Sequence, residues 1–82
     1  MQTDTAKCIL KILYDKHVIG AKHTSTINAT KGLPKHLRGE GEKTLKQLRT
    51  LGYVTFHPTS YGMEVSLNPA KIGEIKTLLE NT

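Results

Sequence analysis

Apolar and polar residues follow two different periods along this chain, and the periods divide it into helical and extended segments. Residues 5–16 place Ala6, Ile9, Leu10 and Leu13 at positions i, i+3, i+4 and i+7, which is the spacing of one helix face. Asp4 precedes the segment and belongs to the residue types that cap helix N-termini. We therefore predict a first helix over residues 5–16.

A second, shorter helix is predicted over residues 26–31. Thr24 or Ser25 provides its N-cap, and Gly32 follows its last residue, as glycine often does at a helix C-terminus. Residues 21–24 are predicted as a short strand before this helix. Gly20 separates that strand from the first helix.

Residues 39–51 carry the pattern around which the rest of the chain is organised. Pro34 suits the first position of a helical turn over residues 35–38, and we expect the next helix to begin near Glu40 after a turn that Gly39 and Gly41 allow. One side of this helix is apolar and is expected to be buried: Thr44, Leu45, Leu48 and Leu51. The opposite side is polar and faces solvent: Gly39, Lys43, Lys46 and Thr50.

Two alternating segments follow Gly52 and predict a β-hairpin. In the strand predicted over residues 53–57, Val54 and Phe56 are expected to face the core. In the strand predicted over residues 63–67, a second set of alternate residues is expected to face it. That second set is Met63, Val65 and Leu67. The five residues between the strands, 58–62, are turn formers.

A last helix begins at Asn68, which acts as its N-cap, with Pro69 at the first helical position. Its apolar face consists of Ile72, Ile75, Leu78 and Leu79. This order of elements predicts an α+β domain over residues 1–82. We interpret it as a winged helix-turn-helix with a three-helix core, a two-stranded β-hairpin wing and a C-terminal helix.

The charge distribution indicates which kind of partner the protein binds. The chain of 82 residues has a net charge of +5. Residues 16–49 hold eight cations and two carboxylates, a net +6, whereas four cations and five carboxylates lie outside this window, a net −1. Positive charge concentrated on one segment favours a polyanionic partner, because solubility alone would be served by charge placed anywhere.

Three stretches make the sequence similar to a group of small archaeal winged-helix proteins. They are residues 33–40 (Leu-Pro-Lys-His-Leu-Arg-Gly-Glu), residues 58–62 (Pro-Thr-Ser-Tyr-Gly) and residues 65–69 (Val-Ser-Leu-Asn-Pro). The resemblance runs from about His23 to Leu79. It implies the winged-helix fold and a DNA-binding role.

Double-stranded DNA is therefore the expected partner, and the basic segment supplies the candidate contacts. On the recognition helix and the turn before it these are Lys35, His36, Arg38, Lys43, Lys46, Gln47 and Arg49. The hairpin contains no Lys or Arg, so its tip offers only neutral groups: His57, Thr59, Ser60 and Tyr61. An alternative use of Lys46 is an i, i+4 ion pair with Glu42.

Other function classes have little support in the sequence. The four histidines lack zinc-ligand spacing, and no phosphate-binding loop or nucleophile motif occurs, so we expect no metal, no cofactor and no enzymatic activity. One cysteine, Cys8, excludes an internal disulfide and suits a reducing cytoplasm. No apolar run reaches the roughly 18 residues of a membrane span.

Three alternatives stay open. The chain is either a DNA-binding regulator or accessory protein, or a module that docks on an acidic protein surface. Cys8 and Ile12 widen the apolar stripe of the first helix, which indicates either core packing or a homodimer through the first and last helices. Single-stranded nucleic acid would require Tyr53 and Tyr61 as stacking platforms.

Overall fold

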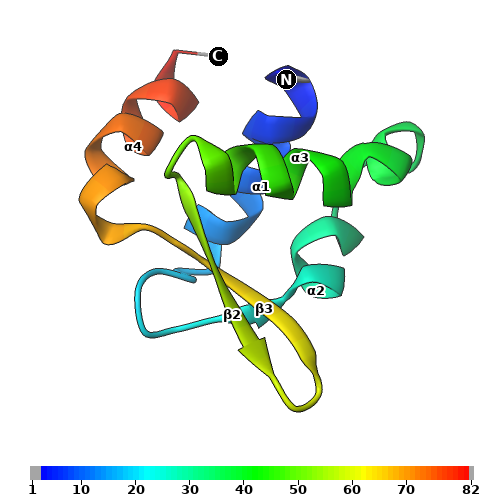
Figure 1. The fold of residues 1–82 in the computed structure, drawn as a ribbon. Helices are drawn as coiled ribbons and strands as arrows, with labels where there is room; N and C mark the ends of the chain where they lie inside the picture. The colour runs from blue at the N-terminus through cyan, green and yellow to red at the C-terminus, as the bar shows by residue number, and fades with distance from the viewer. Residues whose placement is uncertain (1–2, 82) are drawn as a thin grey trace.

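The computed structural model describes residues 3–81, which form four α-helices, two short 3-10 helices and a three-stranded antiparallel sheet (Figure 1). In chain order these are α1 (Thr3–Asp15), β1 (Thr24–Ser25), α2 (Thr26–Lys31), η1 (Lys35–Glu40), α3 (Gly41–Thr50), β2 (Val54–Thr59), β3 (Gly62–Leu67), η2 (Pro69–Lys71) and α4 (Ile72–Glu80). The predicted α+β class is confirmed.

Helix α1 lies at the centre of the core and contacts α2, α3, α4 and β3. Its predicted apolar face is confirmed, because Ala6, Ile9, Leu10 and Leu13 are all buried. The predicted start is wrong: the helix begins at Thr3, so Asp4 lies within the first turn, where its carboxylate still faces the positive end of the helix dipole. The helix also ends one residue earlier than predicted, at Asp15.

Helix α2 agrees with the sequence prediction, and the oxygen of its N-cap Ser25 accepts a hydrogen bond from the backbone N–H of Asn28 at 3.0 Å. Helix α3 packs very closely against it. A Cβ added to the buried Gly41 would lie 2.7 Å from Cγ2 of Thr30 and 3.1 Å from Cδ1 of Leu33. Gly41 has ordinary helical backbone angles, φ −59° and ψ −50°, so its small size is needed for helix packing and not for the turn that the sequence suggested.

The two faces of α3 largely follow the predicted pattern. Thr44, Leu45 and Leu48 are buried, whereas Lys43, Lys46 and Thr50 are exposed. Leu51 departs from the prediction, because the helix ends at Thr50 and the Leu51 side chain is 49% exposed.

The sheet has the strand order β1-β3-β2. The predicted β-hairpin is present as β2 and β3, and β1 extends it to a three-stranded sheet. Strand β1 pairs Thr24 with Val65 and Ser25 with Glu64. The strand predicted over residues 21–24 therefore overlaps the observed strand at Thr24 alone.

The hairpin strands are longer and the turn is shorter than predicted. Ladder pairing continues to Pro58 with Met63 and Thr59 with Gly62, which leaves Ser60 and Tyr61 as the turn. Val65 and Leu67 face the core as predicted. Met63 was predicted to face inward as well, but it lies toward the projecting end of the hairpin and is 39% exposed.

The C-terminal segment begins with Asn68, whose Oδ1 accepts a hydrogen bond from the backbone N–H of Ala70 at 3.0 Å. Pro69 occupies the first position of η2, and α4 starts only at Ile72. Ile75 of α4 is fully buried and closes the core beside α1.

Candidate nucleic-acid interface

The exposed side of α3 gathers three of the predicted contact residues on one surface. Lys43 and Lys46 are exposed, and Gln47 is half-buried at the margin. The residues on the other side of the helix are anchored in the core, so the helix presents these side chains on a fixed backbone.

The three predicted residues before α3 lie on η1. Lys35, His36 and Arg38 are all exposed. Nε of Arg38 donates a hydrogen bond to the carbonyl oxygen of Leu33 at 3.2 Å, which orients the guanidinium group. These side chains precede the N-terminus of α3 and extend its cationic surface along the chain.

The ion pairs within residues 3–81 all lie away from this surface. They are Lys11 with Asp15 at 2.9 Å, His23 with Glu64 at 3.2 Å and Lys71 with Glu74 at 3.5 Å. The alternative pairing of Lys46 with Glu42 does not occur in this part of the chain. We call Lys35, Arg38, Lys43 and Lys46 the α3 cations, and in the described residues none of them has a carboxylate within ion-pair distance.

Arg49 is placed differently from the other predicted contacts. Its guanidinium carbon lies 4.7 Å from the centroid of the Phe56 ring, which is a cation–π contact. This contact ties the C-terminal end of α3 to the first half of β2. Arg49 keeps its charge at the surface and also fixes the hairpin relative to the helix.

Three of the four residues predicted for the wing tip do lie there. Ser60 and Tyr61 form the turn, and Tyr61 is fully exposed. Oγ1 of Thr59 donates a hydrogen bond to the carbonyl oxygen of Gly62 at 2.8 Å and accepts one from the N–H of Tyr61 at 3.2 Å. The Thr59 hydroxyl is therefore used to close the turn.

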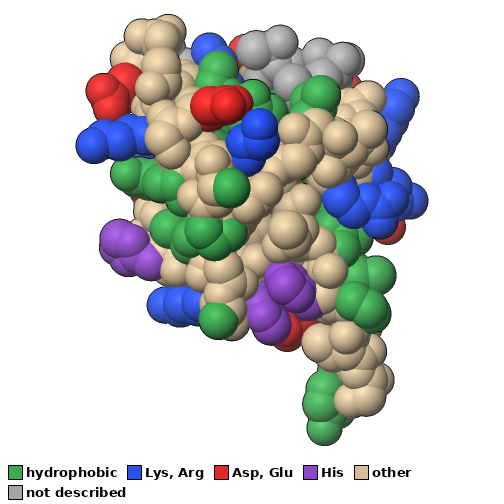
Figure 2. Space-filling view, turned by 60° about the vertical axis from the view of Figure 1, so that its left-hand side comes forward, with side chains coloured by type: hydrophobic (Ala, Val, Ile, Leu, Met, Phe, Trp, Pro, Cys, Tyr) green, Lys and Arg blue, Asp and Glu red, His purple; other side chains and the backbone are tan. Residues whose placement is uncertain are grey.

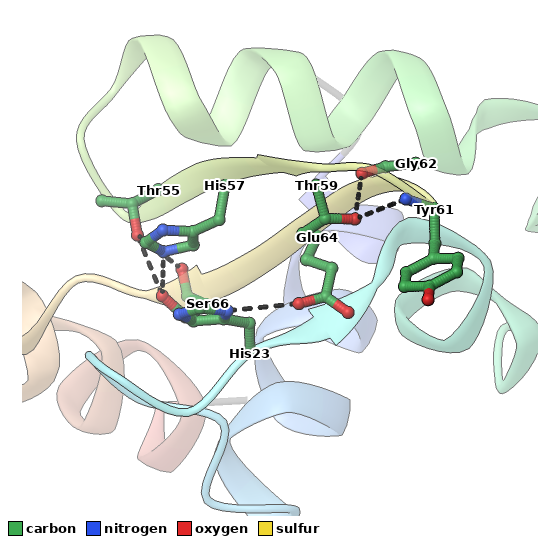
Figure 3. A network of polar contacts seen from close by, with 8 residues as sticks. All are labelled: His23, Thr55, His57, Thr59, Tyr61, Gly62, Glu64 and Ser66. Carbon is green, nitrogen blue, oxygen red and sulfur yellow. Dashed lines mark hydrogen bonds and ion pairs between the residues drawn. The ribbon is translucent and has the colours of Figure 1, made fainter.

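His57 was also predicted at the wing tip, and this placement is wrong. It lies within β2, where its ring stacks on that of His23 with centroids 4.0 Å apart and planes 11° apart (Figure 3). Nε2 of His57 is within hydrogen-bond distance of Oγ of Ser66 and of Oγ1 of Thr55, at 3.0 and 3.1 Å. Strand register brings these side chains to the outer face of the sheet.

We call His23, Thr55, His57, Glu64 and Ser66 the sheet cluster. Its histidine rings are nearly parallel, so their in-plane lone pairs do not converge on one point. Over residues 3–81 we find no group of three or more His, Cys, Asp or Glu side chains able to hold a metal ion. The sequence analysis missed this cluster because only the pairing of three strands assembles it.

Tyr53, the second candidate stacking residue, is half-buried against the core. Its hydroxyl donates a hydrogen bond to Oε2 of Glu74 at 3.1 Å. This bond, with partial burial and the carboxylate charge, raises the pKa of Tyr53 above its ordinary value of 10.0. Its ring is thus engaged within the fold.

A groove of about 540 Å³ lies between α1 and α4, the two helices predicted to mediate a homodimer. Cys8 and Tyr14 contribute apolar surface to it, and Lys7 and Lys76 lie on its lining. Ile12 instead packs against the core, with its Cδ1 3.2 Å from where a Cβ on Gly32 would stand. Core packing therefore accounts for Ile12, whereas Cys8 both packs against the core and lines the groove.

The described residues contain no helix with the length and apolar character needed to cross a membrane. Comparison of the chain with protein-family models, with curated proteins and with solved structures found no match.

Proposed function

We propose that this protein is a small winged helix-turn-helix that binds double-stranded DNA through the exposed side of α3. The α+β arrangement is compatible with a small winged-helix fold, in which a helix before a β-hairpin enters the major groove. As a regulator or accessory protein it would use α3 to read or follow the groove and the residues of η1 to contact phosphates.

The observation that carries this proposal is that the α3 cations have no carboxylate partner among residues 3–81. Residues 16–49 hold a net +6, and the observed ion pairs involve none of Lys35, Arg38, Lys43 and Lys46. These four cations lie on the consecutive segments η1 and α3, and an anion that binds there reduces the repulsion between them. The phosphate backbone of DNA supplies such an anion at regular spacing.

Fluorescence anisotropy with a random-sequence duplex tests this function. If four to six cations contact phosphates, affinity falls by about two to three orders of magnitude between 50 and 200 mM salt. The double variant Lys43→Ala/Lys46→Ala, which removes about two such contacts, should bind about 100-fold more weakly at 50 mM salt and about 8-fold more weakly at 200 mM.

The matched control is Lys7→Ala/Lys76→Ala, which removes the same charge from the groove between α1 and α4. It should change affinity far less than the α3 double variant. Equal losses from the two double variants would show that net charge, and not the α3 surface, drives binding. Absence of duplex binding at 50 mM salt would remove the proposed function.

The neutral hairpin favours a second candidate, a module that docks on an acidic protein surface. Residues 58–63 carry no charged side chain, although a wing that relies on phosphate contact would benefit from cations. This candidate takes first place if the duplex experiment fails.

A homodimer through α1 and α4 is a further proposal, supported by the apolar lining of their shared groove. Sedimentation with and without duplex checks it. A monomer under both conditions would exclude the dimer and leave DNA binding by a single copy.

A further inference from the structure

The two histidines of the sheet cluster form a stacked pair that bridges β1 and β2. His23 directly precedes β1 and His57 lies in β2, with ring centroids 4.0 Å apart. Nδ1 of His23 lies 3.2 Å from Oε1 of Glu64, and the side chains of these two residues are 30% and 37% exposed. Figure 2 shows histidine side chains gathered at the surface beside an acidic side chain. Protons from solvent therefore reach the pair.

Glu64 of β3 supplies the negative charge that faces the pair. The other side chains that strand pairing places on this face of the sheet are uncharged: Ser25, Thr55, Thr59 and Ser66. Lys22 precedes His23 in the chain and is exposed. One carboxylate thus faces two imidazole rings, and histidine is the side chain that ordinarily gains its proton between pH 8 and 5.

The geometry suits one proton on the pair better than none or two. A proton on His23 turns its contact with Glu64 into a charge-assisted ion pair beside a neutral His57 ring. A second proton places positive charge on both stacked rings, and these charges repel each other. Ser66 and Thr55 hold the other edge of His57 (Figure 3), so this ring cannot turn away without losing those hydrogen bonds.

Strand β1 is the element that a change of charge on the pair moves most easily. It is joined to β3 through Thr24 with Val65 and Ser25 with Glu64, whereas the ladder between β2 and β3 runs the full length of both strands. Short elements with few backbone hydrogen bonds open at a low free-energy cost. Ser25 is also the N-cap of α2, so release of β1 reaches the first turn of that helix.

We propose that the His23–His57 pair is a one-proton latch that holds β1 on β3. The latch is tightest when the pair carries one proton, because loss of this proton removes the ion pair with Glu64 and gain of a second adds repulsion between the rings. The closed latch binds a first proton more readily, and a second less readily, than the separated strands do. Pairing of β1 is therefore strongest at an intermediate pH. DNA binding plays no part in the latch, so the two proposals are tested separately.

Amide hydrogen exchange followed by NMR measures the latch from about pH 5 to about pH 8, with rates corrected for the intrinsic pH dependence of exchange. In the wild type, protection of the amides in the β1–β3 pairing should pass through a maximum between about pH 6 and 7, where histidine ordinarily binds its proton. Protection should fall about threefold on each side, because two unit charges about 4 Å apart change an equilibrium several-fold even in bulk water. Amides of the β2–β3 ladder are the internal reference and should not follow this profile.

Three substitutions separate the attraction from the repulsion. His57→Phe keeps a ring for stacking but takes no proton, so the loss of protection at acid pH should disappear while the loss at alkaline pH remains. Glu64→Gln removes the carboxylate, so protection should only fall as pH decreases. His23→Phe removes both effects and should give a flat profile. His36→Phe, the same substitution at an exposed position on η1, is the control and should keep the wild-type maximum.

The ladder amides also show whether each variant folds at neutral pH. A wild type without a maximum, or a His57→Phe variant that retains the loss at acid pH, excludes the latch. If the ladder amides share the maximum, the effect belongs to global stability and a local latch is overturned. Should a phenylalanine variant fail to fold, Glu64→Gln decides alone, since an unchanged maximum in that variant overturns the latch.

Discussion

The exposed side of α3 and the sheet cluster are both polar surfaces. They differ in whether their polar and charged side chains have partners within the described residues. In the cluster, His57 reaches Ser66 and Thr55, His23 reaches Glu64, and the two rings stack on each other. On α3 the cations Lys43 and Lys46 have no carboxylate partner within the described residues. Polar groups that satisfy each other stabilise the fold, whereas cations without partners remain available for a ligand.

The largest expected effect concerns the packing that supports the α3 surface. Gly41→Ala should lower the free energy of unfolding by about 1–3 kcal/mol, because its Cβ would overlap the branched side chain of Thr30 in a tightly packed interior. Chemical denaturation measures the change. Gly39→Ala is the matched control, since a Cβ there meets nothing within 4 Å, and it should leave stability unchanged or slightly raised. Equal stability of the two variants would contradict the close contact between α2 and α3.

The second prediction tests whether the sheet cluster contributes to stability and not to DNA binding. His57→Ala should lower the free energy of unfolding by about 1–2 kcal/mol, because it removes a stacked ring and a partner of the buried Ser66 hydroxyl. Duplex affinity of the folded variant should change little. His36→Ala, at an exposed position on η1, is the control and should change stability by less than about 0.5 kcal/mol. A His57 variant with lost affinity and unchanged stability would assign the sheet cluster to binding.

The smallest effect concerns alkaline pH. Because the hydrogen bond to Glu74 raises the pKa of Tyr53 above its ordinary value of 10.0, an ultraviolet tyrosinate titration should contain a late component from Tyr53. The corresponding stabilisation is fully present below the unfolded pKa and is lost as pH rises through the folded pKa. Tyr53→Phe should remove this late component. A Tyr53 variant that retains the late component would contradict the bond to Glu74.

Helical periodicity was sufficient to predict most of the helical core and the exposed positions of α3. Ala6, Ile9, Leu45 and Leu48 are buried as predicted, because each repeats on one face of a single helix. Periodicity identifies the face of an element but not how far the neighbouring element covers it. This explains Leu51, which follows the last residue of α3, and Met63, which lies toward the projecting end of the hairpin.

Features that depend on pairing between distant segments could not be predicted in the same way. Strand β1 has two residues and so shows no alternation, and its position is fixed by β3. The displacement of His57 from the tip follows from the longer ladder, in which Pro58 is tolerated because β2 is an edge strand. The contact of Arg49 with Phe56 likewise requires the angle between α3 and β2.

The strand order also has a consequence for the time course of folding. The turn at Ser60 and Tyr61 joins neighbouring strands, so β2 and β3 can pair as a local hairpin within microseconds. The ion pair between His23 and Glu64 instead joins residues 41 positions apart, and the pairing of β1 with β3 closes a loop of similar length. This loop contains α2, α3 and β2, so closing it carries a larger entropic cost. Amide protection at Thr24 and Ser25 should therefore report the last stage of folding, when the helices and the sheet join.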